Sequence, residues 1–110
     1  MKLLTKEIRT RLPKLYTTEG QYLDAVAQVK YFHPFSSWYW YGVEFDGRDT
    51  FYGLVVGHYI ELGYFSLSEL EAVRLMKLPI ERELDFKPTP LRELARYHEE
   101  VQGVENLVKE

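Results

Sequence analysis

Alternating apolar and polar residues predict four β-strands in the middle of the chain. Apolar residues alternate with polar ones from Ala25 to His33, and the run from Trp38 to Phe45 is rich in aromatic residues of high strand propensity. Asp46-Gly47 has the composition of a tight hairpin turn, and strands from Asp49 to Val56 and from Tyr59 to Phe65 follow it. The pattern therefore predicts a mostly antiparallel meander.

Changes of period outside this region predict helices. Thr5 is placed to cap a short N-terminal helix that Pro13 ends. After the meander, apolar residues recur at helical intervals from Ser66 to Lys77. A charged connector over residues 80–86 has room for one more short strand, and a final helix is expected from Leu91 to His98.

These elements together predict one α+β domain over residues 1–110. We expect a four- to five-stranded, mostly antiparallel β-meander, a short N-terminal helix, and two C-terminal helices that cover one face. A chain of 110 residues with 45% hydrophobic and 15% aromatic content has the material for one core. The polar tail over residues 103–110 is expected to fray.

The composition excludes several kinds of site. The chain has no cysteine, so a disulfide framework, a thiol nucleophile and a thiolate metal site are excluded. Charged residues follow the two leucines near the N-terminus, so the apolar segment of a signal peptide is missing there. No apolar run is long enough to span a bilayer. We therefore expect a cytoplasmic protein that has no membrane contact and no cofactor.

The charge is distributed unevenly. A formal net charge of -3 disfavours a wholly electrostatic nucleic-acid binder. Positive charge nevertheless gathers near the N-terminus, where Lys6, Arg9 and Arg11 are the best candidates for contact with phosphates. The alternative is that these side chains form the solvated face of a helix.

Aromatic side chains are the densest feature. Alternate residues of a strand point to opposite faces, so Trp38 and Trp40 share one side while Tyr39 and Tyr41 share the other. One row is expected to pack under the helices, which leaves the other row, with Tyr52 of the next strand, for a protein partner or for stacked bases. Ordinary cross-strand packing is the alternative.

Carboxylates and histidines give weaker signals. Glu44, Asp46 and Asp49 surround the predicted hairpin turn and are weak candidates for a divalent metal ion, although turn chemistry explains them better. No histidine pair has the spacing of a zinc site, so no metal is expected there. His58, beside a predicted turn, is the histidine best placed for a binding role.

Three blocks that span nearly the whole chain are distinctive: Leu3–Gly20 (LLTKEIRTRLPKLYTTEG), Phe45–Leu70 (FDGRDTFYGLVVGHYIELGYFSLSEL) and Leu78–Leu91 (LPIERELDFKPTPL). They resemble a small bacterial family described as a domain of unknown function and common on plasmids and integrated mobile elements. The aromatic residues around Tyr39–Tyr41 depart from the family pattern. The resemblance implies a cytoplasmic bacterial setting and brings no catalytic residues with it.

The sequence thus favours a non-enzymatic, protein-binding accessory protein of a bacterial mobile element, either a monomer or a homodimer. One alternative is a single-stranded nucleic-acid binder that uses aromatic stacking and the basic N-terminal segment. Another is a metal-dependent hydrolase that uses the carboxylates near the turn. No catalytic constellation is visible in the sequence, which favours binding over enzymatic activity.

Overall fold

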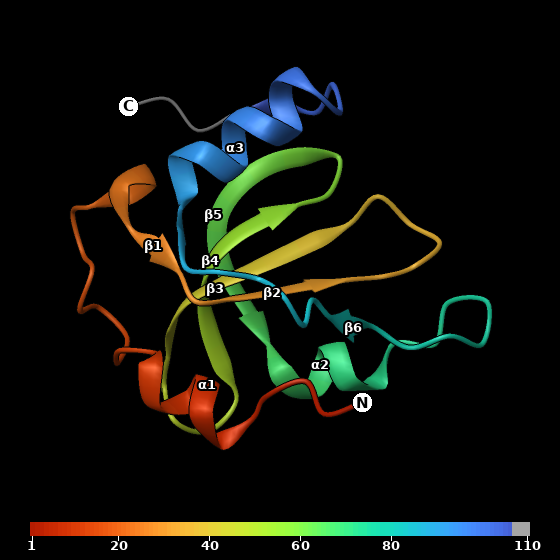
Figure 1. Ribbon diagram of the computed structural model, residues 1–110, viewed down its shortest axis with the longest axis horizontal. Helices are drawn as coiled ribbons and strands as arrows, with labels where there is room; N and C mark the ends of the chain where they lie inside the picture. Colours follow the sequence, from red (N-terminus) through yellow and green to blue (C-terminus); the bar gives the residue numbers. More distant parts are fainter. Residues whose placement is uncertain (107–110) are drawn as a thin grey trace.

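The computed structural model describes residues 1–106 and centres on a twisted six-stranded sheet (Figure 1). Its strands, in spatial order, are β6 (Glu81–Arg82), β2 (Val29–Phe32), β3 (Tyr39–Phe45), β4 (Thr50–Val56), β5 (Tyr59–Ser66) and β8 (Glu105–Asn106). The other elements are α1 (Lys6–Arg11), the 3₁₀ turn η1 (Tyr22–Asp24), α2 (Leu67–Ala72), α3 (Leu91–Glu100) and the separate strand pair β1 (Val26–Ala27) with β7 (Thr89–Pro90).

The sheet confirms the predicted α+β class. Strands β2 to β5 form the antiparallel meander, β6 extends it with a fifth antiparallel strand from the charged connector, and β8 pairs in parallel with β5. The turn between β3 and β4 follows the predicted chemistry, because Asp46 Oδ1 accepts hydrogen bonds from the amides of Arg48, Asp49 and Thr50. Gly47 supplies a φ of +88° in that turn.

Two hydrophobic cores lie on opposite faces of the sheet. Phe51 and Leu54 are three residues apart on β4, so their side chains point to opposite faces. The N-terminal core contains Leu3, Leu4, Ile8, Leu12, Val29, Tyr31, Phe45, Phe51, Leu70 and Ile80. The C-terminal core contains Leu23, Ala25, Ala27, Tyr41, Val43, Leu54, Val56, Ile60, Leu91 and Ala95.

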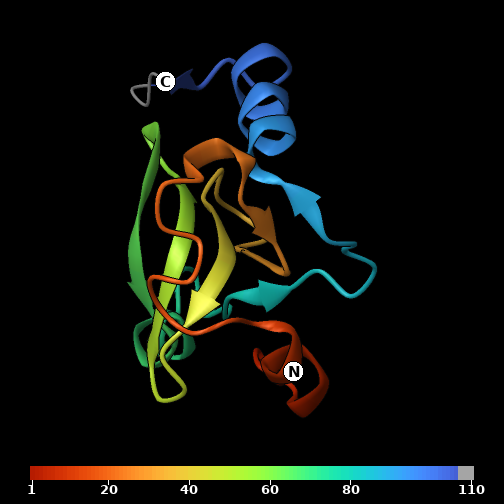
Figure 2. The same cartoon turned by 90° about the vertical axis from the view of Figure 1, so that its left-hand side faces the viewer.

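This division corrects one detail of the predicted architecture. Leu70 places α2 in the N-terminal core, whereas Leu91 places α3 in the C-terminal core, so the two helices do not cover the same face. The edge-on view shows α1 and α3 at opposite ends of the sheet (Figure 2). Strand periodicity identifies two buried faces, but it cannot assign a helix to either.

The helix predicted from Ser66 to Lys77 ends at Ala72. Its start is as expected, since the Ser66 hydroxyl accepts a hydrogen bond from the amide of Glu69. Beyond it the chain turns back, with Met76 and Lys77 at φ values of +54° and +66°. Most helical stability comes from burial of an apolar face, and Met76 is 69% exposed, so nothing supports a further turn of helix.

The C-terminal part of the described chain folds back onto the sheet. Within the predicted tail, Val104 packs against the C-terminal core, and residues 105 and 106 form β8; residues 107–110 lie outside the described part. In the described range, 1–106, no helix has the length and apolar character needed to cross a membrane.

His98 joins α3 to the sheet through a buried polar network. Its ring is fully buried, with Nε2 2.6 Å from the Tyr41 hydroxyl and Nδ1 2.5 Å from Oε1 of Gln102. Because Oε1 can only accept, Nδ1 carries the proton and Nε2 accepts from Tyr41. Burial lowers the pKa of His98 below its ordinary value of 6.5, and the charge of Lys30 acts in the same direction against the opposing bond to Gln102.

We therefore expect acid to destabilise the fold through His98. The unfolded chain takes up this proton near its ordinary pKa and the folded chain resists it, so the free energy of unfolding falls as the pH drops below about 6.5. The slope contributed by one proton is at most about 1.4 kcal/mol per pH unit. Urea unfolding of the protein and of a His98→Gln variant at several pH values measures this contribution. An identical decline in both would contradict the assignment.

Candidate functional site

A β-bulge turns one carboxylate toward the face that carries two tyrosines. The pairing of β3 with β4 runs through Gly42 opposite Gly53 and resumes with Glu44 opposite Tyr52, which leaves Val43 as an extra residue. Tyr52 is in turn opposite Tyr64 of β5. Simple alternation would put Glu44 on the face of Gly42, but the inserted residue moves it to the face of the tyrosines.

Glu44 fastens the loop before η1 to the sheet. Oε1 accepts the amide of Tyr16 at 2.8 Å, while Oε2 accepts the amide and the hydroxyl of Thr18, both at 2.6 Å. The amide of Phe45 also donates to Pro13 at 2.9 Å. Residues 13–18 are thereby held against β3, and Figure 2 shows this segment climbing from α1 to η1 beside the strands. Glu44 is only 3% exposed, so the loop encloses its carboxylate.

Four tyrosines and two glutamates surround a pocket between this loop and the sheet, which we call the tyrosine pocket. Its volume is about 260 Å³, and its lining is Tyr16, Thr18, Glu19, Gly20, Tyr22, Glu44, Tyr52 and Tyr64. The rings of Tyr52 and Tyr64 lie 5.2 Å apart at 58°. Tyr16, Tyr22 and Tyr64 are 65%, 58% and 55% exposed, so the pocket opens to solvent between tyrosine rings.

Two of these tyrosines have an unfavourable backbone. Tyr16 and Tyr22 have φ values of +73° and +49°. This left-handed region costs a residue that has a side chain roughly 1–2 kcal/mol. Tight turns fix them there, with the amide of Glu19 bonded to the carbonyl of Tyr16 and the amide of Ala25 to that of Tyr22. Strain of this kind persists only where surrounding contacts enforce it, and it concentrates at functional sites.

The phenols of Tyr52 and Tyr64 stay protonated at neutral pH. Desolvation by the surrounding protein raises the pKa of Tyr64, and the neighbouring Tyr16 adds to this effect. Burial likewise raises the pKa of Tyr52, with the charge of Glu44 next in importance. The pocket therefore offers neutral hydroxyls and electron-rich ring faces, and its formal charge comes from Glu19 and Glu44.

The predicted aromatic site residues do not all lie in one place: Tyr52 lines the tyrosine pocket, and the aromatic residues of β3 pack elsewhere in the fold. Tyr41 is 1% exposed and Tyr39 stacks on it with ring centroids 6.5 Å apart, so the tyrosine row of β3 is the row that packs under α3. The predicted separation of the two rows is correct, but the expectation that one row is left free is wrong: Trp40 packs against the N-terminal core, and Trp38 is the exposed tryptophan.

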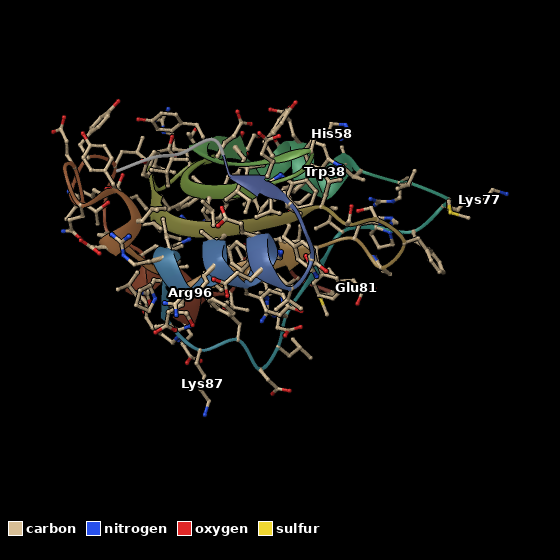
Figure 3. All side chains as sticks on the ribbon, turned by 90° about the horizontal axis from the view of Figure 1, so that it is seen from above. Trp38, His58, Lys77, Glu81, Lys87 and Arg96 are labelled. Atoms are coloured by element: carbon tan, nitrogen blue, oxygen red, sulfur yellow. The ribbon has the colours of Figure 1, made fainter. Side chains whose placement is uncertain are left out.

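Trp38 and His58 lie side by side (Figure 3). Their ring centroids are 5.7 Å apart, and Trp38 is 37% exposed. The indole covers Gly57, where an added Cβ would lie 2.5 Å from the ring. Trp38 thus has a packing role in the β4–β5 turn, and neither it nor His58 contributes to the tyrosine pocket.

The basic candidates of α1 are already engaged within the fold, apart from the exposed Lys6. Arg9 donates to the carbonyl of Gly47 at 2.8 Å, and its guanidinium lies 5.1 Å from the centroid of the Phe45 ring. Arg11 pairs with Glu7 at 3.1 Å. Arg9 therefore links α1 to the β3–β4 turn, a structural role that its charge in the sequence does not indicate.

The three carboxylates near the turn serve separate purposes. Glu44 holds the loop, Asp46 caps the turn, and Asp49 accepts from the hydroxyl of Ser66 and the amide of Ser68 at the start of α2. These hydrogen bonds lower the pKa of Asp46, through the turn amides, and of Asp49, through Ser66 first. Among the described residues, no group of three or more histidine, aspartate or glutamate side chains is arranged to hold a metal ion.

Sequence reasoning missed Tyr16, Tyr22 and Tyr64 as site residues. The segment from Leu15 to Gly20 has the composition of a loop, and no sequence pattern marks the strained Tyr16 within it or the strained Tyr22 just after it. One signal was available: Tyr52 and Tyr64 are cross-strand partners if the β4–β5 turn is placed at Gly57-His58. That register would have identified half of the aromatic lining.

Comparison with known proteins supports the resemblance carried by the three sequence blocks. A family model described as a protein of unknown function (DUF2958) matches residues 3–108. No curated protein and no solved structure matches the chain.

Proposed function

Because the chain belongs to the DUF2958 family, a family of unknown function, we propose its function from the tyrosine pocket: it is a non-enzymatic protein that binds another protein by receiving one of its side chains there. The observation that carries this proposal is the pocket's construction. A buried carboxylate fixes a strained loop so that exposed tyrosine rings surround a small hollow.

The size of the pocket favours a side chain over a free metabolite. Its volume of about 260 Å³ is below the roughly 300–1,000 Å³ typical of sites that enclose small molecules. Three of its tyrosines are more than half exposed, so a ligand confined to the hollow leaves much ring surface uncovered. A protein partner covers that surface as well, and tyrosine is among the residues most enriched at binding hot spots.

The two alternative functions stay predictions. A nucleic-acid binder would use Lys6, Arg9 and Arg11, of which the two arginines hold intramolecular partners and Lys6 is exposed. A hydrolase would use carboxylates that each bind backbone amides. Neither alternative gains a specific observation in its favour.

We expect peptide selection to find ligands for the pocket. Peptides selected from a random displayed library on the full chain should bind it at least about tenfold more tightly than a Tyr22→Ala, Tyr64→Ala variant, because hot-spot tyrosines contribute about 2 kcal/mol or more. Both side chains are more than half exposed, so their truncation leaves the cores intact.

Tyr59→Ala is the matched control for this selection. Tyr59 is 44% exposed on the same strand as Tyr64 but lies an odd number of residues from it, on the opposite face. Selected peptides should bind this variant as they bind the original protein. Peptides that bind the pocket variant without loss would contradict the proposed function.

We further propose that the protein works as an accessory protein in the cytoplasm of a bacterium that carries a plasmid or integrated mobile element. The resemblance of the three sequence blocks supports this setting.

A further inference from the structure

We propose that the tyrosine pocket recognises an alkylammonium group, the chemistry of a lysine side chain; this inference rests on the proposed function and names the group that the partner inserts. The sign of the charge is the first argument. The described lining includes the carboxylates of Glu19 and Glu44 and no lysine, arginine or histidine. A cation is therefore the charged group that this lining attracts.

The ring faces supply the second argument. Four tyrosines line the hollow, and the raised pKa values of Tyr52 and Tyr64 keep these phenols neutral. The face of a neutral aromatic ring carries negative electrostatic potential and attracts an ammonium group within about 6 Å of its centroid. Sites formed by several such rings bind ammonium groups even when these have no hydrogen to donate.

At the buried carboxylate Glu44, the hydrogen bonds already made favour an ammonium over a guanidinium group; the exposed Glu19 carries the other negative charge of the lining. A guanidinium group binds best to a carboxylate that presents two free oxygens to its planar fork. Both oxygens of Glu44 already accept from the loop, and Oε2 does so twice. Glu44 therefore contributes its charge without serving as a bidentate partner, an arrangement that suits the compact charge of an alkylammonium group.

The strained loop gives this recognition its geometry. Tyr16, within the segment that Glu44 fastens, and Tyr22, at the start of η1, both occupy left-handed conformations, and Tyr52 and Tyr64 of the sheet line the same hollow. Rings from the loop and rings from the sheet thus surround the hollow before any ligand arrives. Such preorganisation removes part of the ordering that binding otherwise requires.

Choline and its uncharged isostere 3,3-dimethylbutan-1-ol test the inference, because they share a shape and differ in charge. In ¹H–¹⁵N NMR titrations of the full chain, choline should shift the amides of Tyr16, Thr18 and Tyr22. The isostere should need at least about tenfold higher concentration for the same response, since the attractions of several partly exposed ring faces for the cation add up to this scale. Butylammonium should shift the same amides, and methylguanidinium should bind more weakly than either cation.

Variants separate the ring from its hydroxyl. Tyr64→Leu should weaken choline binding at least about fivefold, whereas Tyr64→Phe should stay within about twofold of the original protein, because the ring face makes the contact. Tyr59→Leu, on the opposite face of β5, should bind choline unchanged. Loss of binding in Tyr64→Phe equal to that in Tyr64→Leu would overturn the aromatic assignment.

The remaining outcomes distinguish this inference from the proposed function. Equal binding of choline and its isostere would overturn recognition of charge, and tighter binding of methylguanidinium would overturn the choice of ammonium. Selected peptides that depend on the pocket but share no lysine would also overturn the inference, while leaving the protein-binding function in place. Selected peptides that ignore the pocket would contradict the proposed function itself.

Discussion

Replacing Gly53 with alanine is expected to lower the free energy of unfolding by about 3 kcal/mol or more, among the larger effects of single substitutions. A Cβ at this position would lie 1.8 Å from the carbonyl oxygen of Tyr41 and 2.9 Å from its carbonyl carbon. These are backbone atoms of the adjacent strand, so no side-chain rotation relieves the clash. The strands must separate at the bulge, which also disturbs the position of Glu44.

Gly63 provides a matched control for this substitution. It is the cross-strand partner of Gly53 on β5, and a Cβ added to it meets no atom within 4 Å. Gly63→Ala should change stability by less than about 1 kcal/mol, with stabilisation the expected direction, because alanine restricts the unfolded chain. Urea unfolding monitored by tryptophan fluorescence measures both variants. Equal stability of Gly53→Ala and Gly63→Ala would show that the close approach at the bulge is absent.

Replacing Glu44 with alanine is expected to release the loop and to lower the free energy of unfolding by about 2–4 kcal/mol, because three hydrogen bonds to a buried carboxylate are lost. Hydrogen exchange should locate the damage. The amides of Tyr16 and Thr18, which donate to this carboxylate, should lose their protection from exchange. Amides of the central meander should still exchange only through global unfolding.

Glu19→Ala controls for the loss of one negative charge from the pocket. Glu19 lines the same hollow but is exposed, so its removal should leave the protection of both loop amides unchanged. Glu44→Gln keeps the volume of the side chain and replaces one acceptor oxygen with a donor, so it should have an intermediate effect. Unaltered protection of Tyr16 and Thr18 in Glu44→Ala would contradict the role given to this carboxylate.

The strands and turns of the sheet could be predicted from the sequence because their physical causes are local. Alternation of apolar and polar residues defines the faces of β2. In the turn between β3 and β4, Asp46 supplies the side-chain acceptor and Gly47 the positive φ. The bulge could not be predicted in this way. Val43 fits the strand pattern as well as its neighbours do, and only the pairing with β4 shows that it is an extra residue.

The candidate site was predicted only in part for the same reason. Tyr52 was recognised as an aromatic strand residue, but Glu44 was interpreted through its closeness in sequence to Asp46 and Asp49. Its actual partners, Tyr16 and Thr18, are 28 and 26 residues away and belong to a loop with no regular pattern. Contacts of that range depend on the assembled sheet, so composition and periodicity do not reveal them.

Isotope-filtered NOE spectroscopy of the full chain with choline tests the central claim most directly, because it reports which protons touch the ligand. The trimethylammonium protons should give cross-peaks to ring protons of Tyr22, Tyr52 and Tyr64, which line the pocket together with Glu44. Cross-peaks confined to Trp38 or to other rings outside this lining, at choline concentrations that shift the loop amides, would contradict the account.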